Sequence, residues 1–458
     1  MTYYLHAPSA VEGLLITCYL LLFAYLSLKN LKWGIYLIGA LLPTYLIRFT
    51  ILGIPATLLE GMIVILFIIW LVKEKVSLNP LVWIENIKEQ GAKSKEQNAI
   101  PHTLRLPIVL LLAASTISVF VSPDLRAALG IWKAYFIEPL MFLLIFVYNV
   151  KTTDEIKKVI RCLGLTVLAI GVFAIIQKLT GALIPNPFWA AEATRRVTTF
   201  FGYPNANALF LVPIILLTVG NLISDFLIKV FSFKFLVLSF LIIVLGTLTI
   251  IWTQSAGGLI AVIAGIIALA LMYKKIRLPV LLLILILTTM AVFSPMVKSE
   301  ISKTLVQISS THLPLNASDF QIRAQQWRET LAMLADTPIF GAGLAGYQTL
   351  VAPYHQNPHV EIYLYPHNFF LNFWTETGLL GLISIIWILI VFFALIYKAQ
   401  KKQPTIWTLI TASAMMALLV QGKVDVPYFK NDLAILFWII VGIVIVLYNA
   451  NSSRMARE

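Results

Sequence analysis

The sequence predicts an all-α fold: a polytopic integral membrane bundle of 12–13 transmembrane helices, with residues 1–458 as a single membrane-embedded domain. Hydrophobic types make up 60% of the chain and charged types only 12%, against about 25% in soluble domains. Apolar runs of roughly 20 residues, long enough to cross a bilayer, recur along the chain. This composition excludes a soluble enzyme, a disordered protein and a nucleic-acid-binding domain, so we expect no nucleic-acid partner. Two cysteines are too few for a disulfide scaffold.

Each predicted span is an apolar run, and the runs are taken in chain order. The first run has no basic stretch before it and no small-residue cleavage site after it, so we expect a retained helix rather than a signal peptide. The count falls to twelve if one N-terminal span is re-entrant. The runs cover residues 12–28, 33–48, 56–72, 106–121, 134–150, 159–177, 206–224, 235–252, 257–273, 279–296, 370–397, 405–421 and 431–448.

The basic residues orient this bundle and account for the net charge of +13. With the N-terminus outside and the C-terminus in the cytoplasm, most of the 34 lysines and arginines fall in inside loops, as the positive-inside rule requires. Residues 73–105 then form a Lys-rich cytoplasmic loop, interpreted as a solvated linker. Residues 297–366 form a long outer loop with short helices, and a loop of this size suggests a working part. We expect contact with anionic membrane lipids at the basic loops.

Polar groups gather on the predicted outer side. Four of the six histidines lie between positions 312 and 367, and four arginines lie in outer loops. This location excludes nucleotide-dependent chemistry, and no glycine-rich nucleotide motif occurs in a fitting context. The arginines are Arg195, Arg196, Arg323 and Arg328.

Residues 320–338 have the pattern of an amphipathic helix. Trp327, Leu331 and Leu334 are expected to share one face that lies along the membrane surface, and Pro338 to end the helix. The glycines that follow, at positions 341, 343 and 346, allow a tight turn. Such a turn can present backbone N–H groups to an anion, or it can simply reverse the chain.

His355 and His359 are four residues apart, with Glu361 nearby, which is a spacing that can hold a metal ion. The intervening Asn-Pro argues against a helix, and no second cluster completes a site. We therefore expect no metal and no cofactor.

The stretch from Tyr365 to Gly381 opens a span with polar residues. Asn368, Asn372 and Glu376 follow at helical spacing, so they form one stripe at the start of an apolar helix. An ionisable group there is costly, so Glu376 is either functional or paired with an arginine for packing. His367 stands at the mouth of this helix, and because an imidazole titrates near neutral pH it is a candidate general base. The alternative is an inert interfacial histidine.

Arg195 and Arg196 precede a second polar segment that enters a span at its outer end and contains Asn205. Two adjacent arginines on the outer side run against the positive-inside trend. This position favours a role in ligand binding over a role in setting the topology. Other charges at the predicted membrane rim, Glu138 and Arg48 with Glu60, are interpreted as packing pairs.

These motifs in this order resemble the O-antigen ligase and O-antigen polymerase superfamily of bacterial envelope proteins. The resemblance covers the motifs of residues 190–385 and the hydropathy of the whole chain. Members often carry Ser-Arg where this chain has Ser255-Ala256, so a basic group is absent there or is replaced by another arginine. The motifs are Arg196 with Pro204-Asn205, Thr253-Gln254-Ser255, Arg323 with Trp327, Pro338-x-x-Gly341-x-Gly343, His367-Asn368-x-x-Leu371, and Glu376-x-Gly378-x-x-Gly381.

The resemblance implies a metal-independent, inverting glycosyl transfer on the periplasmic face of the bacterial inner membrane. The donor is a glycan on undecaprenyl diphosphate, and the acceptor is a hydroxyl on lipid A-core, another glycan or a protein. Arginine suits the diphosphate because its guanidinium binds phosphate bidentately. Arg196 and Arg323 are the expected diphosphate clamp, with Arg195 and Arg328 as substitutes. His367 is expected to activate the acceptor, and Asn205, Asn368 and Glu376 to bind or orient substrate.

The resemblance leaves several functions open. A ligase is the first expectation, because His-Asn at the start of a span is typical of it. A polymerase, a protein O-glycosylation enzyme and a non-enzymatic transporter of lipid-linked glycans are the alternatives. A transporter is expected to place its paired charges near the bilayer midplane, whereas the charges of this sequence concentrate at the outer rim.

Overall fold

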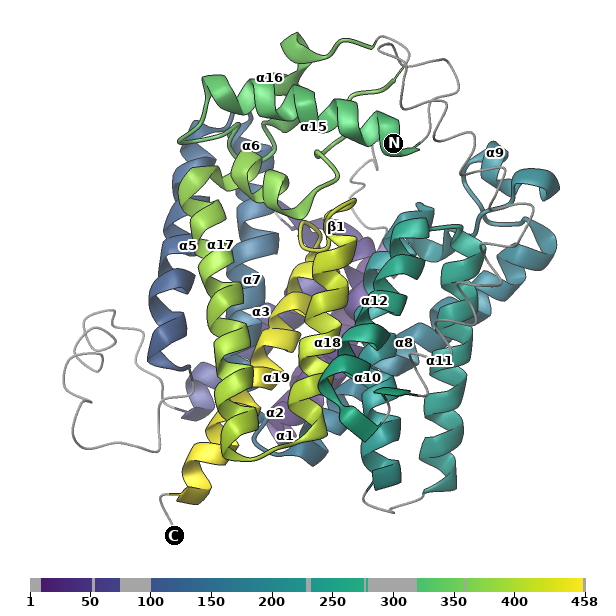
Figure 1. The fold of residues 1–458 in the computed structure, drawn as a ribbon, viewed down its shortest axis with the longest axis vertical. Coiled ribbons are helices and arrows are strands. Elements are labelled where there is room, and N and C mark those ends of the chain that lie inside the picture. The colour runs from purple at the N-terminus through teal and green to yellow at the C-terminus, as the bar shows by residue number, and fades with distance from the viewer. Residues whose placement is uncertain are drawn as a thin grey trace.

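The computed structural model describes residues 10–51, 54–74, 100–227, 232–275, 277–278, 319–357 and 360–455 (Figure 1). Within these ranges, eight helices are long and apolar enough to cross a membrane, and two shorter apolar helices accompany them. The predicted all-α polytopic bundle is therefore confirmed, and the chain is a multi-pass membrane protein. The predicted span at 279–296, most of the 73–105 loop and residues 297–318 of the outer loop lie outside the described residues.

The N-terminal part departs from the prediction. The expected span at 33–48 is wrong, because α2 ends at Ala40 and a 3₁₀ turn and a hairpin follow. Pro43 explains the end of α2, since its ring clashes with the carbonyl four residues earlier and cannot continue an α-helix. In the antiparallel hairpin, Arg48 pairs with Thr57 and Ile51 with Ile54. The elements are α1 (Ala10–Lys29), α2 (Leu31–Ala40), η1 (Leu42–Leu46), β1 (Arg48–Ile51), β2 (Ile54–Thr57) and α3 (Leu58–Glu74).

The next elements form three long helical passages. The second is continuous from Leu125 to Asn149, because α6 and α7 are joined by a π-helical segment. Lys133 of that segment pairs with Glu60 at 2.6 Å and donates to the carbonyl of Pro55 at 3.1 Å, which ties the hairpin region to the bundle. The elements are α5 (His102–Val121), α6 (Leu125–Trp132), η2 (Lys133–Ile137), α7 (Glu138–Asn149) and α8 (Thr153–Thr180).

The remaining elements complete the bundle. The spans of α10 and α19 are 78% and 83% buried, against 11% for α1, so α10 and α19 form the centre and α1 the periphery. The elements are α9 (Pro187–Ala190), η3 (Glu192–Thr194), η4 (Thr199–Phe201), α10 (Pro204–Leu227), α11 (Phe233–Thr253), α12 (Ala256–Met272), α15 (Asp319–Asp336), α16 (Tyr347–Val351), η5 (Ala352–Tyr354), α17 (Phe369–Lys402), α18 (Ile406–Gln421) and α19 (Asn431–Met455).

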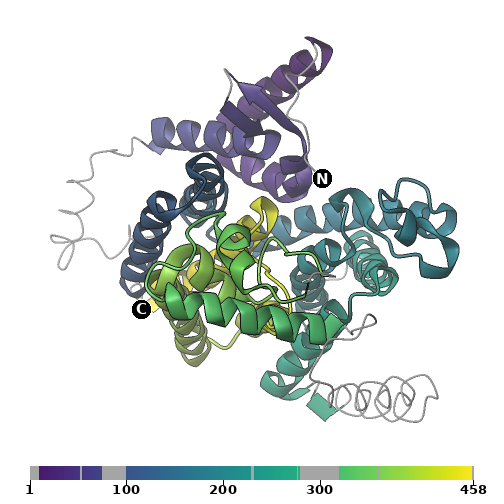
Figure 2. The same ribbon diagram turned by 90° about the horizontal axis from the view of Figure 1, so that it is seen from above.

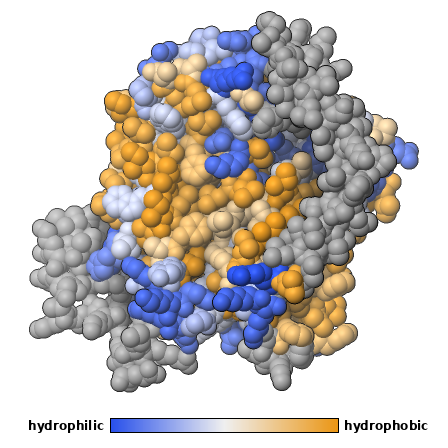
Figure 3. All heavy atoms as spheres, viewed as in Figure 1, coloured by the Kyte–Doolittle hydropathy of each residue, from blue (hydrophilic) through white to orange (hydrophobic). Residues whose placement is uncertain are grey.

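The surface has an apolar band between two hydrophilic ends (Figure 3). One end contains lysines that the sequence analysis assigns to the cytoplasmic side. Among them, Lys32 pairs with Glu155, and Lys157 pairs with Asp225 at 2.7 Å. At the opposite end, α15 lies across the bundle (Figures 1 and 2). We call these the lysine end and the α15 end.

A kink in α17 receives the glycine-rich segment that follows α15. Gly378 has φ +66° and ψ −176° inside the helix. The carbonyl of Ile339 accepts a hydrogen bond from Leu379 N at 2.9 Å, and a Cβ on Gly378 would overlap that same carbonyl oxygen. Only glycine combines this left-handed backbone with so close an approach. The Glu376-x-Gly378 motif therefore builds a docking point between α17 and the segment after α15.

We predict that Gly378→Ala lowers the melting temperature of the purified protein. The substitution adds backbone strain and a clash with Ile339, which together exceed about 1 kcal/mol. The matched control is Gly130→Ala in α6, where nothing lies within 4 Å of the added Cβ. Equal melting temperatures for the two variants would contradict the role of Gly378.

Candidate functional site

Helix α15 holds the backbone that leads to His367. The indole of Trp327 donates to the carbonyl of Pro366 at 2.9 Å, and the amide of Gln326 donates to the carbonyl of Tyr365 at 2.7 Å. The Arg323-x-x-x-Trp327 motif thus places Arg323 one helical turn from this contact. Of the apolar side chains in α15, Met333 and Leu334 are buried against the rest of the protein, whereas Leu331 is 49% exposed.

His367 sits in an unusual backbone conformation just before α17. Its φ is +45°, which is rare for a residue with a side chain. Asn368 follows as the N-cap of α17: its Oδ1 accepts from Phe370 N and Leu371 N, both at 3.1 Å. The Asn368 amide also donates to the carbonyl of Lys423 at 3.2 Å. Asn368 therefore fixes the helix start and the neighbouring loop, and these bonds engage the amide that was expected to orient substrate.

The loop between α18 and α19 supplies a carboxylate to His367. Nδ1 of His367 lies 3.4 Å from Oδ1 of Asp425, which is only 5% exposed. The rings of Tyr363 and Tyr365 pack edge-on against the imidazole, each with its centroid 5.1 Å away. A buried carboxylate at Nδ1 favours the tautomer that leaves Nε2 as the proton acceptor. The arrangement therefore fixes the orientation of the imidazole.

Electrostatics link Arg323 to this group. Burial raises the pKa of the Tyr365 hydroxyl, the Asp425 carboxylate and Tyr203 raise it further, and the Arg323 guanidinium opposes them. Arg323 and Asp425 therefore both lie within electrostatic reach of the ring that packs on His367. Arg328, the expected substitute, is exposed on α15.

Arg196 joins two motifs that are far apart in the sequence. Its Nε donates to the carbonyl of Thr253 at the end of α11 at 2.8 Å, and its Nη2 donates to Oδ1 of Asn205 at 3.4 Å. Its guanidinium also faces the ring of Trp189, 5.9 Å from the centroid. Three of the predicted elements, Arg196, Asn205 and the Thr253 motif, are thus brought together.

Arg195 has a different environment. Its Nε donates to the carbonyl of Ala190 at 3.2 Å, and its Nη1 donates to the carbonyl of Lys178 at 3.0 Å in the last turn of α8. A cation at a helix C-terminus satisfies carbonyls that have no partner within the helix. Arg195 therefore caps α8, which argues against its expected use as a substitute in the clamp.

The glycine-rich turn is a chain reversal, and its N–H groups are engaged. Ala342 N donates to the carbonyl of Thr375 at 2.7 Å, and Ala345 N donates to Oε2 of Glu376 at 2.8 Å. An anion site at these groups is therefore wrong. The alternative that Glu376 pairs with an arginine is also wrong, because its buried carboxylate binds the turn instead.

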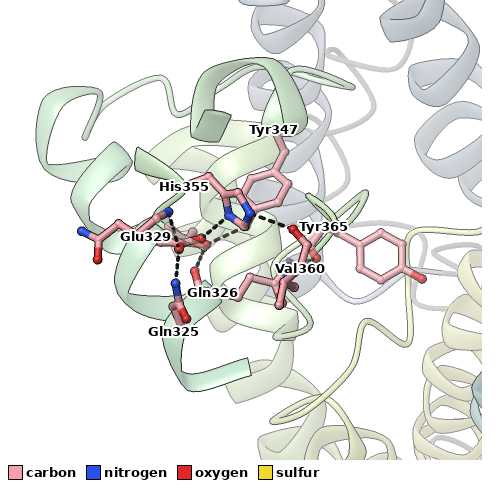
Figure 4. A network of polar contacts seen from close by, with 9 residues as sticks. Gln325, Gln326, Glu329, Tyr347, His355, Val360 and Tyr365 are labelled. Carbon is pink, nitrogen blue, oxygen red and sulfur yellow. Dashed lines mark hydrogen bonds and ion pairs between the residues drawn. The ribbon is translucent and has the colours of Figure 1, made fainter. Parts of the chain in front are cut away.

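His355 belongs to a polar network beside α15 (Figure 4). Its Nδ1 lies 3.0 Å from Oε2 of Glu329 and its Nε2 lies 2.8 Å from the carbonyl oxygen of Val360. Both partners are acceptors, so the protonated imidazole satisfies both. His359 lies outside the described residues, and the described part of the chain holds no cluster of three metal-ligating side chains. A small pocket lies next to this network, lined by Glu329, Tyr347, His355, Glu361 and Tyr363, among others.

Comparison with known proteins adds the family. Residues 240–386 match the sequence model of the family described as O-Antigen ligase. This match, over about a third of the chain, supports membership of the O-antigen ligase superfamily. No curated protein matches the chain. The match contains Arg323, Trp327 and His367, whereas Arg196 and Asp425 lie outside it.

The match supports, in general terms, a function of the ligase and polymerase kind and an enzymatic role. Family proteins of this kind act on lipid-linked glycans and acceptors at a membrane. The structure brings His367 to Asp425 and Arg196 to Asn205, and it places Arg323 one helical turn before Trp327, which binds the carbonyl of Pro366.

Sequence reasoning missed two charged residues of the α18–α19 loop. Asp425 and Lys430 lie in a short polar run between two apolar spans, and that position at the predicted outer rim was the available signal. Lys430 packs over the ring of Phe201, 4.1 Å from its centroid, and lies 3.7 Å from Asp432. Burial lowers the pKa of Lys430, and the carboxylates of Asp432 and Asp425 act in the opposite direction.

We predict that His355 stabilises the protein more at acid than at alkaline pH. Burial acts to lower the pKa of His355, but its bonds to Glu329 and Val360 raise the net value above 6.5. Because the folded-state pKa is raised, the stabilisation is complete below the unfolded-state pKa and disappears as pH rises through the folded-state pKa.

The measurement compares melting temperatures of the wild type and His355→Gln at about pH 5.5 and about pH 8.5. The loss of unfolding free energy in the variant, obtained from these melting temperatures, should be about 1 kcal/mol at the lower pH and smaller at the higher pH. His102→Gln, an exposed position at the start of α5, is the control. A deficit that is the same at both pH values would contradict the prediction.

Proposed function

We propose that this protein transfers a glycan from undecaprenyl diphosphate to an acceptor hydroxyl, as an O-antigen ligase. The single observation that carries the proposal is the His367–Asp425 pair next to α15, the helix that carries Arg323. The α15 end is then the periplasmic face of the bacterial inner membrane, and the lysine end is cytoplasmic. This orientation agrees with the positive-inside rule.

The proposed reaction is a direct displacement at the sugar carbon. Nε2 of His367 takes the proton from the acceptor hydroxyl as its oxygen forms the new bond to the anomeric carbon. The bond between that carbon and the diphosphate oxygen breaks, and its electron pair leaves with the diphosphate, so the sugar carbon is inverted. The carboxylate of Asp425, 3.4 Å from Nδ1, stabilises the imidazolium that forms.

The arginines have the complementary role in this proposal. Negative charge develops on the departing diphosphate, and Arg196 and Arg323 would bind it through charge-assisted hydrogen bonds. The contacts of Arg196 with Thr253 and Asn205 hold its guanidinium in place before substrate arrives. Two guanidinium groups supply the charge that metal ions supply in other phosphate sites, so the proposed transfer is metal-independent.

Transfer to lipid A-core makes the protein a ligase, whereas transfer to another lipid-linked glycan makes it a polymerase, and transfer to a protein is a third acceptor class.

The enzyme is preferred over a glycan transporter because the polar cluster lies at one end of the bundle. A transporter is expected to place its binding site near the midplane.

The deciding experiment measures which lipid-linked glycans accumulate in cells that lack this protein. We predict long polymer on the carrier, because a ligase acts after chain growth. Single repeat units on the outer leaflet would indicate a polymerase, and glycan confined to the cytoplasmic leaflet would contradict the enzyme and favour a transporter.

The same cells test His367. We predict that His367→Ala fails to restore product although it reaches wild-type abundance in the membrane, because no group then accepts the hydroxyl proton. The control is His102→Ala, at the start of α5, which should restore product fully. Rescue by His367→Ala would contradict the proposed base.

We also predict that Asp425→Asn lowers kcat by about a hundredfold or more and changes KM little. The amide keeps the shape of the side chain but neither selects the tautomer of His367 nor stabilises its charged form. Asp336→Asn, which removes only a contact with Tyr354 beside α15, is the control. A large rise in KM with unchanged kcat would assign Asp425 to substrate binding instead.

A further inference from the structure

Two aromatic side chains pack together next to Arg196. Trp189 is in α9, and Tyr203 follows η4, one residue before α10. Their rings pack edge-to-face with centroids 6.3 Å apart and an interplanar angle of 72°. On one side, the guanidinium of Arg196 lies 5.9 Å from the Trp189 centroid. The aromatic pair therefore lies next to Arg196, the residue proposed to bind the diphosphate.

On the other side, the segment of Tyr203 approaches the α18–α19 loop. Lys430 of this loop lies 4.1 Å from the ring centroid of Phe201, two residues before Tyr203, and Asp425 of the same loop lies 3.4 Å from Nδ1 of His367. The segment of Tyr203 thus adjoins Arg196, through Trp189, and also the loop that carries Asp425, the partner of His367.

Tyr203 is also available to a ligand. It is 58% exposed, although it lies next to buried residues of η4 and α10. The carbonyl of Tyr203 lies 3.3 Å from the buried amide of Asn207, and Asn207 in turn donates to the carbonyl of Thr198 at 2.9 Å. The backbone is therefore fixed while the ring faces outward, which is the arrangement of a rigid contact surface.

The chemistry of the donor dictates what must lie at this point. The first sugar is bonded directly to the diphosphate, and its anomeric carbon must be within reach of the acceptor oxygen that His367 deprotonates. That sugar therefore lies between the cations and the base. Sugar rings have apolar C–H faces and polar edges, and they stack on tyrosine and tryptophan, whose rings combine a large apolar face with a polar tip.

We propose that Trp189 and Tyr203 form the subsite for the sugar attached to the diphosphate, with Tyr203 as the stacking platform and Trp189 as its support. This inference rests on the proposed glycosyl transfer and adds residues that select the sugar. Tyr203 is a binding and positioning residue, since it orients the anomeric carbon and takes no proton in the reaction.

An alternative role for an exposed tyrosine at a membrane end is interfacial anchoring. Phe188 provides the matched control, because it is 64% exposed in the same segment, adjacent to Trp189, and makes no ring contact with Tyr203 in the described part of the chain. An anchoring role predicts equal effects at both positions and for every ligand, whereas a sugar subsite predicts an effect of Tyr203 that requires the glycan.

The experiment measures binding of two carriers to the purified full chain in neutral detergent. One is the lipid-linked glycan isolated from cells that lack this protein, and the other is undecaprenyl diphosphate without a sugar. We expect Tyr203→Ala to weaken binding of the glycan carrier about tenfold and to leave binding of the sugar-free carrier unchanged. Tyr203→Phe keeps the ring and should bind as the wild type, as should Phe188→Ala.

Three results would overturn the inference: wild-type affinity of Tyr203→Ala for both carriers, equal loss for both carriers, or an equal loss in Phe188→Ala. If Tyr203→Ala does not fold, Tyr203→Leu, which removes the ring but keeps an apolar side chain, takes its place in the same assay. A wild type that binds neither carrier would contradict the proposed function itself. A wild type that binds the sugar-free carrier as tightly as the glycan carrier would contradict only the sugar subsite.

Discussion

The hydrogen bond from the Trp327 indole to the carbonyl of Pro366 is the contact on which the candidate site depends. It fixes the backbone immediately before His367, and the N-cap of Asn368 fixes the backbone immediately after it. Between these two anchors His367 takes a φ of +45°, a conformation that persists only where its surroundings hold it. The same helix carries Arg323, so one element positions both a cation and the imidazole.

The polar groups of the site lie at the end of an apolar bundle for a physical reason. Burying an unpaired charge within the hydrocarbon region is costly, whereas at the end of the spans a charge can meet backbone carbonyls, helix caps and carboxylates. Arg195, Arg196 and Glu376 each bind backbone groups in this way. Helix ends are therefore both the scaffold of the site and the source of its hydrogen-bonding partners.

The family motifs divide into those that hold helices and turns together and those that contribute side chains to the candidate site. Gly378, the turn after Pro338 and Glu376 form a single docking arrangement, in which α17 kinks to receive the segment that follows α15. Arg196 and His367 are instead each held against an aromatic ring, Arg196 beside Trp189 and His367 beside Tyr365, and Arg323 lies one helical turn before Trp327. Spacing in the sequence could not separate these two groups, because both are polar or glycine-rich runs at the start of a span.

The sequence by itself determined the membrane bundle and the grouping of lysines at one end, because hydropathy and charge are local properties. The roles of Arg196, Arg323 and His367 stay predictions, which the family resemblance supplied. It missed the hairpin after α2, because the run at 33–48 is apolar throughout and only Pro43 marks the break. The tertiary structure alone decided that Asp425 meets His367, that Arg195 caps α8, and that Glu376 binds a turn rather than an arginine. These partners come from distant segments, and only the packing of the helices brings their side chains within bonding distance.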